Sequence, residues 1–175
     1  MNTMVKSMPA KGSAFSYSTS LLPAIQRTTS AQAVKPSIVS MADRATPLRI
    51  LVVDDNEINQ VVACKFLQKF GCHAEVARNG REALDSIAKV VYDAVLMDCE
   101  MPEINGYKAT QEIRRQEQGT THHLPIIALT GHASSEDQQK CREAGMDDVV
   151  TKPMTLPTLR TKLERLLAQP DFRHR

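Results

Sequence analysis

The sequence lacks a long hydrophobic run, a paired cysteine motif and a glycine-rich loop behind its first predicted strand. No apolar stretch approaches the roughly 18–20 residues that a membrane-spanning helix needs, so we expect no membrane span. Without a glycine-rich loop after residues 49–53, a nucleotide or flavin site is not expected. The four cysteines are scattered, which is typical of reduced thiols buried as small hydrophobes and not of a disulfide framework. No cysteine lies at ligand spacing from His122 and His123, so we expect no zinc site there.

Acidic residues are almost missing from the beginning of the chain. Residues 1–46 contain five Lys/Arg, thirteen Ser/Thr and a single acid, Asp43, and they show no sustained periodicity. This composition predicts a disordered, basic, Ser/Thr-rich tail. It also fits an organelle transit peptide, of the plastid kind more than the mitochondrial kind because arginine is sparse. A third alternative is that Met41 is the true start of the protein.

Residues 47–168 have the opposite charge balance, with fifteen Lys/Arg against eighteen Asp/Glu. A mildly acidic part argues against a nucleic-acid partner, which requires a basic face. The length suits one domain with a proper core. Only a short tail, residues 169–175, follows, so we expect no attached output module. We expect a cytoplasmic monomer, or a nuclear or plastid protein if the first segment is a targeting sequence.

From Leu48 onward, short apolar runs alternate with helical periodicity. The predicted strands are residues 49–53, 73–77, 94–97, 125–129 and 147–150. Each is followed by a predicted helix; the first carries its expected apolar face on Ile58, Val61, Val62, Phe66 and Phe70 and stops at Gly71. Ser134 and Asp137 predict a capping box at the fourth helix. The alternation predicts a single α/β domain: a doubly wound, flavodoxin-like sheet of five parallel strands with helices on both faces.

Polar residues follow four of these strands, namely Asp54, Asp55, Asp98, Thr130 and Lys152. Each alone has an ordinary explanation as a helix cap, a turn residue or a surface lysine. In an open parallel sheet, however, the carboxyl ends of the strands form the ligand-binding edge. Carboxylates at close range repel each other, which raises their pKa values. Protonation of one carboxyl or a bound cation removes this repulsion. Such a group with one lysine suits Mg²⁺ and a phosphoryl group.

Five sequence blocks in order make this pattern specific: LVVDDN at 51–56, MDCEMPEINGY at 97–107, ALTGHA at 128–133, AGMDD at 144–148 and TKP at 151–153. Together they resemble a response-regulator receiver domain, and most of all the receivers of hybrid histidine kinases. The resemblance covers about Leu48 to Leu167. Five blocks in the right order are a strong signal, although each alone is weak.

The resemblance implies phosphorelay signal transduction. Asp98 would accept a phosphoryl group from a phosphohistidine on a histidine kinase or a histidine-containing phosphotransfer protein. Asp54 and Asp55 would form the acidic pocket, and Asp55, Asp98 and the backbone carbonyl of Glu100 would bind Mg²⁺. The protein would catalyse only its own phosphorylation and dephosphorylation and would not otherwise be an enzyme.

Further implied roles concern the other strand ends. Lys152 would bond the phosphoryl oxygens from a cis Lys152–Pro153 peptide, and Thr130 would move its hydroxyl onto the phosphate as a switch. Two residues depart from the family pattern. Val149 stands where many receivers place a switching aromatic residue, which puts the usual readout in doubt. Gly131 leaves the site open, which predicts a short-lived phosphorylated form.

Two alternatives stay open. Asp98-Cys99-Glu100 faintly resembles the nucleophile motif of haloacid-dehalogenase phosphohydrolases, although Glu100 and the residues behind it fit that motif poorly. Within the receiver interpretation, the protein could relay phosphate onward or act as an output regulator. Val149 favours the relay, because it weakens the aromatic switch that an output regulator would use.

Overall fold

A computed structural model describes residues 46–132 and 134–168. Five parallel strands form one sheet in the order β2-β1-β3-β4-β5. The strands are β1 Arg49–Val53, β2 His73–Ala77, β3 Ala94–Asp98, β4 Ile126–Thr130 and β5 Asp148–Thr151. The helices are α1 Glu57–Lys69, α2 Gly80–Ile87, α3 Gly106–Glu117, α4 Ser135–Ala144 and α5 Leu156–Leu167. This architecture confirms the predicted fold class, whereas the predicted tails, apart from Thr46, lie outside the described residues.

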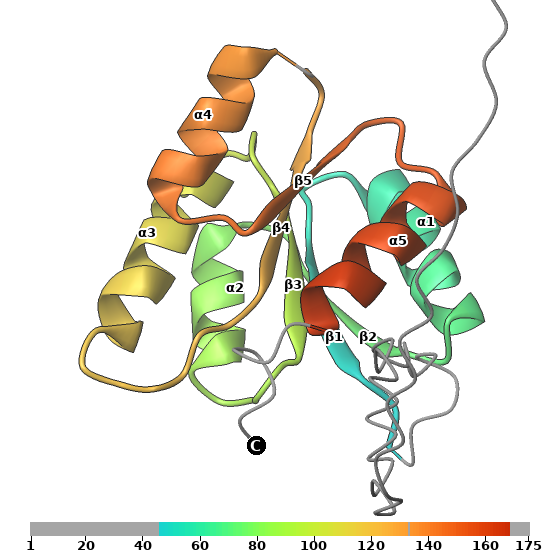
Figure 1. Cartoon of the computed structure of the whole chain (residues 1–175), viewed down its shortest axis with the longest axis horizontal. Helices are drawn as coiled ribbons and strands as arrows, with labels where there is room; N and C mark the ends of the chain where they lie inside the picture. The colour runs from blue at the N-terminus through green and yellow to red at the C-terminus, as the bar shows by residue number, and fades with distance from the viewer. Residues whose placement is uncertain (1–45, 133, 169–175) are drawn as a thin grey trace, which may run out of the picture. The chain divides into compact units, whose positions relative to one another are not determined.

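The sheet is covered on both faces, and this explains the unbroken apolar runs of its central strands. In β1, Ile50 and Val52 belong to the core cluster under α1 and α5, while Leu51 and Val53 belong to the cluster under α2, α3 and α4. Figure 1 shows these two helical layers on either side of the sheet. A strand buried on both faces has no polar side to expose, so alternation is lost from its sequence. In the described part of the chain no helix has both the length and the apolar character to cross a bilayer.

Three strands end one residue later than predicted. β3 includes Asp98, which pairs with Leu129, and β4 includes Thr130, which pairs with Thr151. Pro125 lies just before β4, where it has no N–H to donate, but its carbonyl accepts the Val95 N–H at 2.8 Å. Asp98 and Thr130 are therefore the last residues of rigid strands and not the first residues of loops.

The predicted apolar face of α1 is wrong at its N-terminal end. Ile58 and Val61 are 73% and 51% exposed. The buried positions of the helix are instead Gln60, Ala63 and Leu67, whereas Phe70 is buried as predicted. The physical reason is that the helix is rotated to bring the Gln60 amide against the end of β1, where it forms a hydrogen bond.

Helix ends follow the predicted local chemistry. Gly71, with φ of 75°, stands just beyond the end of α1. At α4 the Ser134 hydroxyl accepts the Asp137 N–H at 3.0 Å and donates to the Asp137 carboxylate at 2.6 Å. The carboxylate thus binds the capping hydroxyl, and the predicted cap is confirmed.

The cysteines are all free thiols, as predicted. Cys72, Cys99 and Cys141 are buried, and Cys64 is half-buried. The Sγ atoms of Cys99 and Cys141 lie 3.7 Å apart. Burial raises the pKa of the Cys99 thiol to about 12, which keeps it protonated. These residues pack as small apolar side chains.

Candidate functional site

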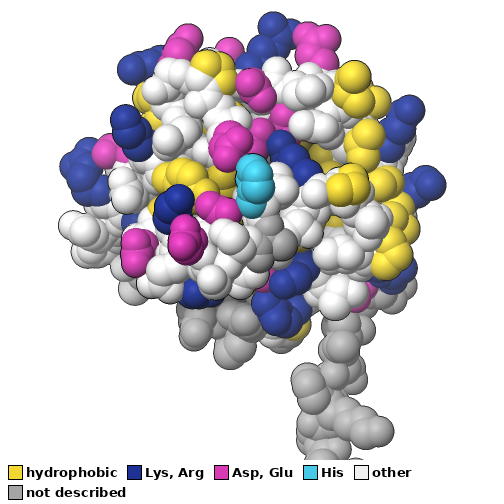
Figure 2. All heavy atoms as spheres, turned by 90° about the horizontal axis from the view of Figure 1, so that it is seen from above, with side chains coloured by type: hydrophobic (Ala, Val, Ile, Leu, Met, Phe, Trp, Pro, Cys, Tyr) yellow, Lys and Arg dark blue, Asp and Glu magenta, His cyan; other side chains and the backbone are white. Residues whose placement is uncertain are grey.

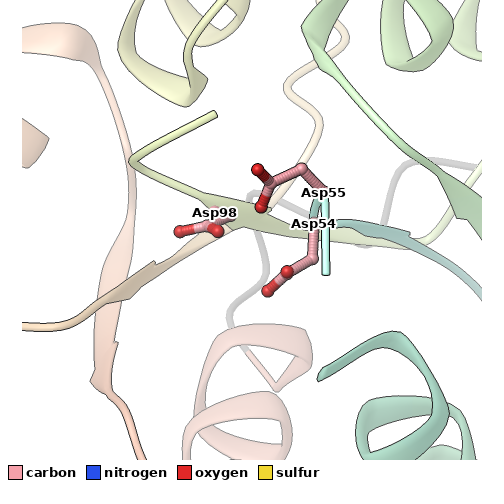
Figure 3. Close-up of side chains that lie close together, drawn as sticks. All are labelled: Asp54, Asp55 and Asp98. Atoms are coloured by element: carbon pink, nitrogen blue, oxygen red, sulfur yellow. The ribbon is translucent and has the colours of Figure 1, made fainter. Parts of the chain in front are cut away.

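Three carboxylates meet at the carboxyl edge of the sheet. Asp54 and Asp55 follow β1, Asp98 ends β3, and these neighbouring strands place one carboxylate oxygen of each within 4.8 Å of the others. Figure 3 shows the three side chains grouped at the ends of the two strands. Asp54 is fully buried and Asp98 is 5% exposed, whereas Asp55 is exposed. The cluster therefore has a closed base and an open side.

Lys152 reaches this cluster from the residue that follows β5. Its Nζ lies 2.8 Å from Asp54 Oδ2 and 2.7 Å from Asp98 Oδ2. The Lys152 backbone N–H donates to the Thr130 carbonyl at 2.7 Å, which holds the end of β5 against β4. The Lys152–Pro153 peptide bond is cis, as the sequence predicted. One ammonium group thus binds two carboxylates that come from different strands.

The site disfavours the ionised form of the Asp98 carboxyl. Burial is the main cause that raises the pKa of this carboxyl, and Asp54 raises it further, while Lys152 and the Glu100 N–H oppose the shift. Burial alone would lower the pKa of Lys152, but its hydrogen bonds and its attraction to Asp54 and Asp98 outweigh burial and raise it. The lysine therefore stays charged but does not fully compensate Asp98. A further cation would favour the ionised carboxylate.

The backbone around Asp98 is tightly packed. The Glu100 N–H points at Asp98 Oδ1 at 3.3 Å. At Gly106, the first residue of α3, a Cβ atom would stand 2.0 Å from the Asp98 carbonyl oxygen. Only glycine allows this approach, so the first residue of α3 packs directly against the backbone of Asp98.

Thr130 lies at the same edge, but its hydroxyl is engaged in its own loop. Thr130 Oγ1 donates to the His132 carbonyl and accepts the His132 N–H, both at 3.2 Å. Next to it, a Cβ added at Gly131 would meet no atom within 4 Å. Gly131 therefore faces open space, while the openness of the phosphorylation site stays a prediction. Val149 on β5 is half-buried and packs against the same core cluster as Tyr107, under α2, α3 and α4.

Sequence reasoning missed three amide residues that hold Asp54. The Asn56 backbone N–H donates to Asp54 Oδ1 at 2.9 Å, and the Asn59 side-chain Nδ2 donates to the same oxygen at 3.1 Å. Gln60 Nε2 donates to the Asp54 carbonyl at 2.6 Å. The available signal was a pair of amides inside an apolar helix directly after Asp54-Asp55.

Exposed apolar residues border the acidic cluster on one side. We call Ile58 and Val61 of α1, with Pro153 and Pro157 before and within α5, the apolar rim. Figure 2 looks onto this end of the molecule and shows hydrophobic side chains along one side, where α1 and α5 lie in Figure 1. Acidic side chains and one histidine occupy the middle of the same face. The acidic cluster therefore opens beside a surface suited to a protein partner.

Comparison with known sequences gives one family. Residues 50–164 match the response regulator receiver domain. Histidine kinase 1 of Arabidopsis thaliana is 38% identical over 140 residues, which cover 61% of this chain and 12% of that protein. Sensor histidine kinase RcsC of Salmonella typhimurium is 38% identical over 128 residues, which cover 73% and 13%. The chain thus spans only 12–13% of the length of these curated relatives.

Solved structures agree. The receiver domain of sensor histidine kinase PA1611 from Pseudomonas aeruginosa, crystallised with a magnesium ion in its active-site cleft, is 40% identical with a TM-score of 0.64. That match covers 71% of this chain and all of the other. The receiver domain of Ssk1 from Saccharomyces cerevisiae, crystallised with the histidine phosphotransfer protein Ypd1, is 31% identical with a TM-score of 0.65; the match covers 72% and 94%.

Proposed function

The chain belongs to the response regulator receiver family, and on that premise we propose that Asp98 accepts a phosphoryl group from a phosphohistidine on a partner protein. The observation that carries the proposal is the meeting of Asp54, Asp55, Asp98 and Lys152 at one sheet edge. Each residue comes from the end of a strand, so the packed sheet holds the group in place. The arrangement combines a nucleophile, an ammonium and oxygen ligands for a divalent cation.

The donor set fits Mg²⁺. Hard oxygen ligands are what this ion prefers, and the exposed side at Asp55 leaves room for the waters that it keeps. Asp55, Asp98 and the Glu100 carbonyl would hold the ion, with Asp54 completing the acidic pocket. When bound, Mg²⁺ supplies positive charge that offsets the repulsion between an anionic nucleophile and an anionic phosphoryl group.

The transfer itself needs no general base. An Asp98 carboxylate oxygen forms a bond to phosphorus, the bond from phosphorus to the imidazole nitrogen breaks, and the electron pair stays on the imidazole. Lys152 stabilises the negative charge on the phosphoryl oxygens. Rigid placement at the end of β3, braced by Gly106, keeps the oxygen oriented for attack.

Phosphorylation then changes the local charge. The phosphoryl group carries about 1.5–2 negative charges, in place of the single charge of the carboxylate, near the end of β4. We expect the Thr130 hydroxyl to leave its bonds with His132 and donate to the phosphoryl group. Because Val149 offers no aromatic ring to follow this movement, we assign the protein to phosphate relay more than to aromatic-switch output.

The apolar rim supports a protein partner that carries a phosphohistidine. A phosphohistidine donor must bring its imidazole to Asp98, and exposed Ile58 and Val61 lie on the helix that begins directly after the acidic residues. Burial of such side chains against a partner stabilises a complex. A histidine kinase or a histidine phosphotransfer protein, as in the Ypd1–Ssk1 complex, is the expected donor or recipient.

The test is phosphoryl transfer from a purified phosphohistidine donor with Mg²⁺ present. We expect label on the wild type and on Asp85→Asn, an exposed control carboxylate, but none on Asp98→Asn. Equal labelling of wild type and Asp98→Asn would overturn the assignment. Turnover of p-nitrophenyl phosphate separates the phosphohydrolase alternative, since a receiver shows essentially none.

A further inference from the structure

The first turns of α1 place polar and apolar side chains against the usual preference. Ile58 and Val61 face solvent, while the neighbouring Gln60 is 7% exposed. Burial of a Val or Ile side chain is favourable, and burial of an amide is unfavourable unless the amide is hydrogen-bonded. A specific interaction must therefore set the rotation of this helix.

That interaction is with Asp54. Gln60 Nε2 donates to the Asp54 backbone carbonyl at 2.6 Å, and Asn59 Nδ2 donates to Asp54 Oδ1 at 3.1 Å. Because Asp54 is fully buried, water cannot replace these donors. One amide holds the backbone at the end of β1, and the other shares the carboxylate oxygen with the Asn56 N–H.

The remaining contacts of Asp54 come from elsewhere in the fold. Its N–H donates to the Ala77 carbonyl at 3.2 Å, and its Oδ2 binds Lys152. The side-chain contacts from α1 thus reach Oδ1 and the carbonyl, and these two atoms determine how the chain turns into exposed Asp55. The orientation of both acidic residues depends on this helix.

We propose that Asn59 and Gln60 are positioning residues for the acidic pocket. They fix the backbone and the carboxylate of Asp54, and through them the direction of Asp55, toward a divalent cation at Asp98. This inference rests on the proposed function. The same two bonds set the rotation of α1 that leaves Ile58 and Val61 in the apolar rim, so the metal pocket and the partner-facing surface share one support.

The experiment uses the full chain with near-isosteric variants that remove the donors, Asn59→Leu and Gln60→Met. The first readout is hydrogen exchange of the Asn56 backbone amide, measured by NMR without metal. The second is the Mg²⁺ dissociation constant, measured by isothermal titration calorimetry. Leu67→Ala, which alters the buried face of the same helix, is the control for general destabilisation.

In both variants we expect the Asn56 amide to exchange about tenfold faster and Mg²⁺ to bind about tenfold more weakly. The reason is that each variant lacks a group that orients a metal ligand. Gln60→Met should unfold at a lower denaturant concentration than the wild type, because it leaves the buried Asp54 carbonyl without this donor. Leu67→Ala should also unfold earlier, yet it should bind Mg²⁺ as the wild type does. Unchanged exchange at Asn56 overturns the inference, and so does Mg²⁺ binding weakened equally by Leu67→Ala. A wild type that binds Mg²⁺ but takes no label at Asp98 would instead overturn the proposed function alone.

Discussion

At the scale of single residues, Asp98 carries the electrostatic strain of a nearly buried charge. Its carboxylate is nearly buried, lies beside Asp54 and shares one lysine with it. Burial and like charge destabilise its ionised form, and a bound cation relieves both. We therefore expect a bound divalent cation to stabilise the ionised form of Asp98.

This strain predicts that Asp98→Asn stabilises the metal-free protein at neutral pH. Folding raises the pKa of Asp98, so the native state holds its proton more tightly than the unfolded chain does. The cost of ionisation is absent below the ordinary value of 3.8 and fully present once the pH exceeds the raised native value. We expect the denaturant midpoint of Asp98→Asn to exceed that of the wild type at pH 7 and the difference to vanish toward pH 3.8.

The control for that measurement is Asp85→Asn, which makes the same change at an exposed carboxylate of α2. A variant Asp98→Asn that is less stable than the wild type throughout this range would show that the bond to Lys152 outweighs burial.

Gly131 predicts the lifetime of the phosphorylated state. A side chain is missing at Gly131, which faces open space, and we expect this to let water reach an aspartyl phosphate at the end of β3. We expect decay well within hours, and severalfold slower decay in the series Gly131→Ala, Gly131→Val and Gly131→Leu as the side chain grows. The measurement is loss of labelled phosphate after the donor is removed, with Mg²⁺ present. Label that persists for many hours in the wild type, or decay that is equal across the series, contradicts the prediction.

At the scale of elements, α1 serves two neighbours at once. Its inner side carries Gln60, Ala63 and Leu67 toward the sheet, and its outer side carries Ile58 and Val61 toward solvent. The inner side contributes to folding and to the acidic pocket. The outer side is exposed, and we propose that a partner binds there, so substitutions on the two sides should have separable effects.

Ile58→Glu tests the outer side. We expect about tenfold slower phosphoryl transfer from a phosphohistidine protein, because a charge replaces an apolar contact in the interface. Labelling by acetyl phosphate, which needs no docking, should match the wild type. Val91→Glu, at an exposed valine outside the apolar rim, is the matched control. Equal loss with both donors would place the effect in the chemistry or the fold instead of in docking.

At the scale of the whole molecule, we propose that residues 47–168 form the complete receiver unit. Among the residues that the structure describes, the members of the two core clusters run from Leu48 to Leu167. Leu48 and Leu167 are both buried, so the boundaries lie close to the outermost core positions.

A fragment of residues 47–168 should therefore fold alone and accept phosphate on Asp98. We expect its thermal midpoint to lie within about 2 °C of that of the full chain, a difference worth less than about 1 kcal/mol. Differential scanning calorimetry of both proteins, followed by the labelling assay, checks this. A midpoint lowered by several degrees would mean that flanking residues belong to the folded unit.

Much of this molecule was predictable from its sequence. Apolar β-branched runs alternating with helical periodicity identified the strands and helices of the described residues, because burial on both faces and right-handed crossovers leave few arrangements. The strand ends then placed Asp54, Asp55, Asp98, Thr130 and Lys152 at one edge without any knowledge of distances. The errors in strand bounds were one residue, as for Pro125, whose carbonyl joins the sheet although its nitrogen cannot.

The sequence by itself determined the fold, the family and the edge at which the polar residues gather, since these follow from local patterns and their order. Only the tertiary structure decided that Lys152 binds both Asp54, 98 residues away, and Asp98. It alone decided that Gln60, and not Val61, faces the sheet. Periodicity rewards the burial of apolar side chains, and it does not include the hydrogen bond from Gln60 to the buried Asp54 carbonyl that reverses this preference.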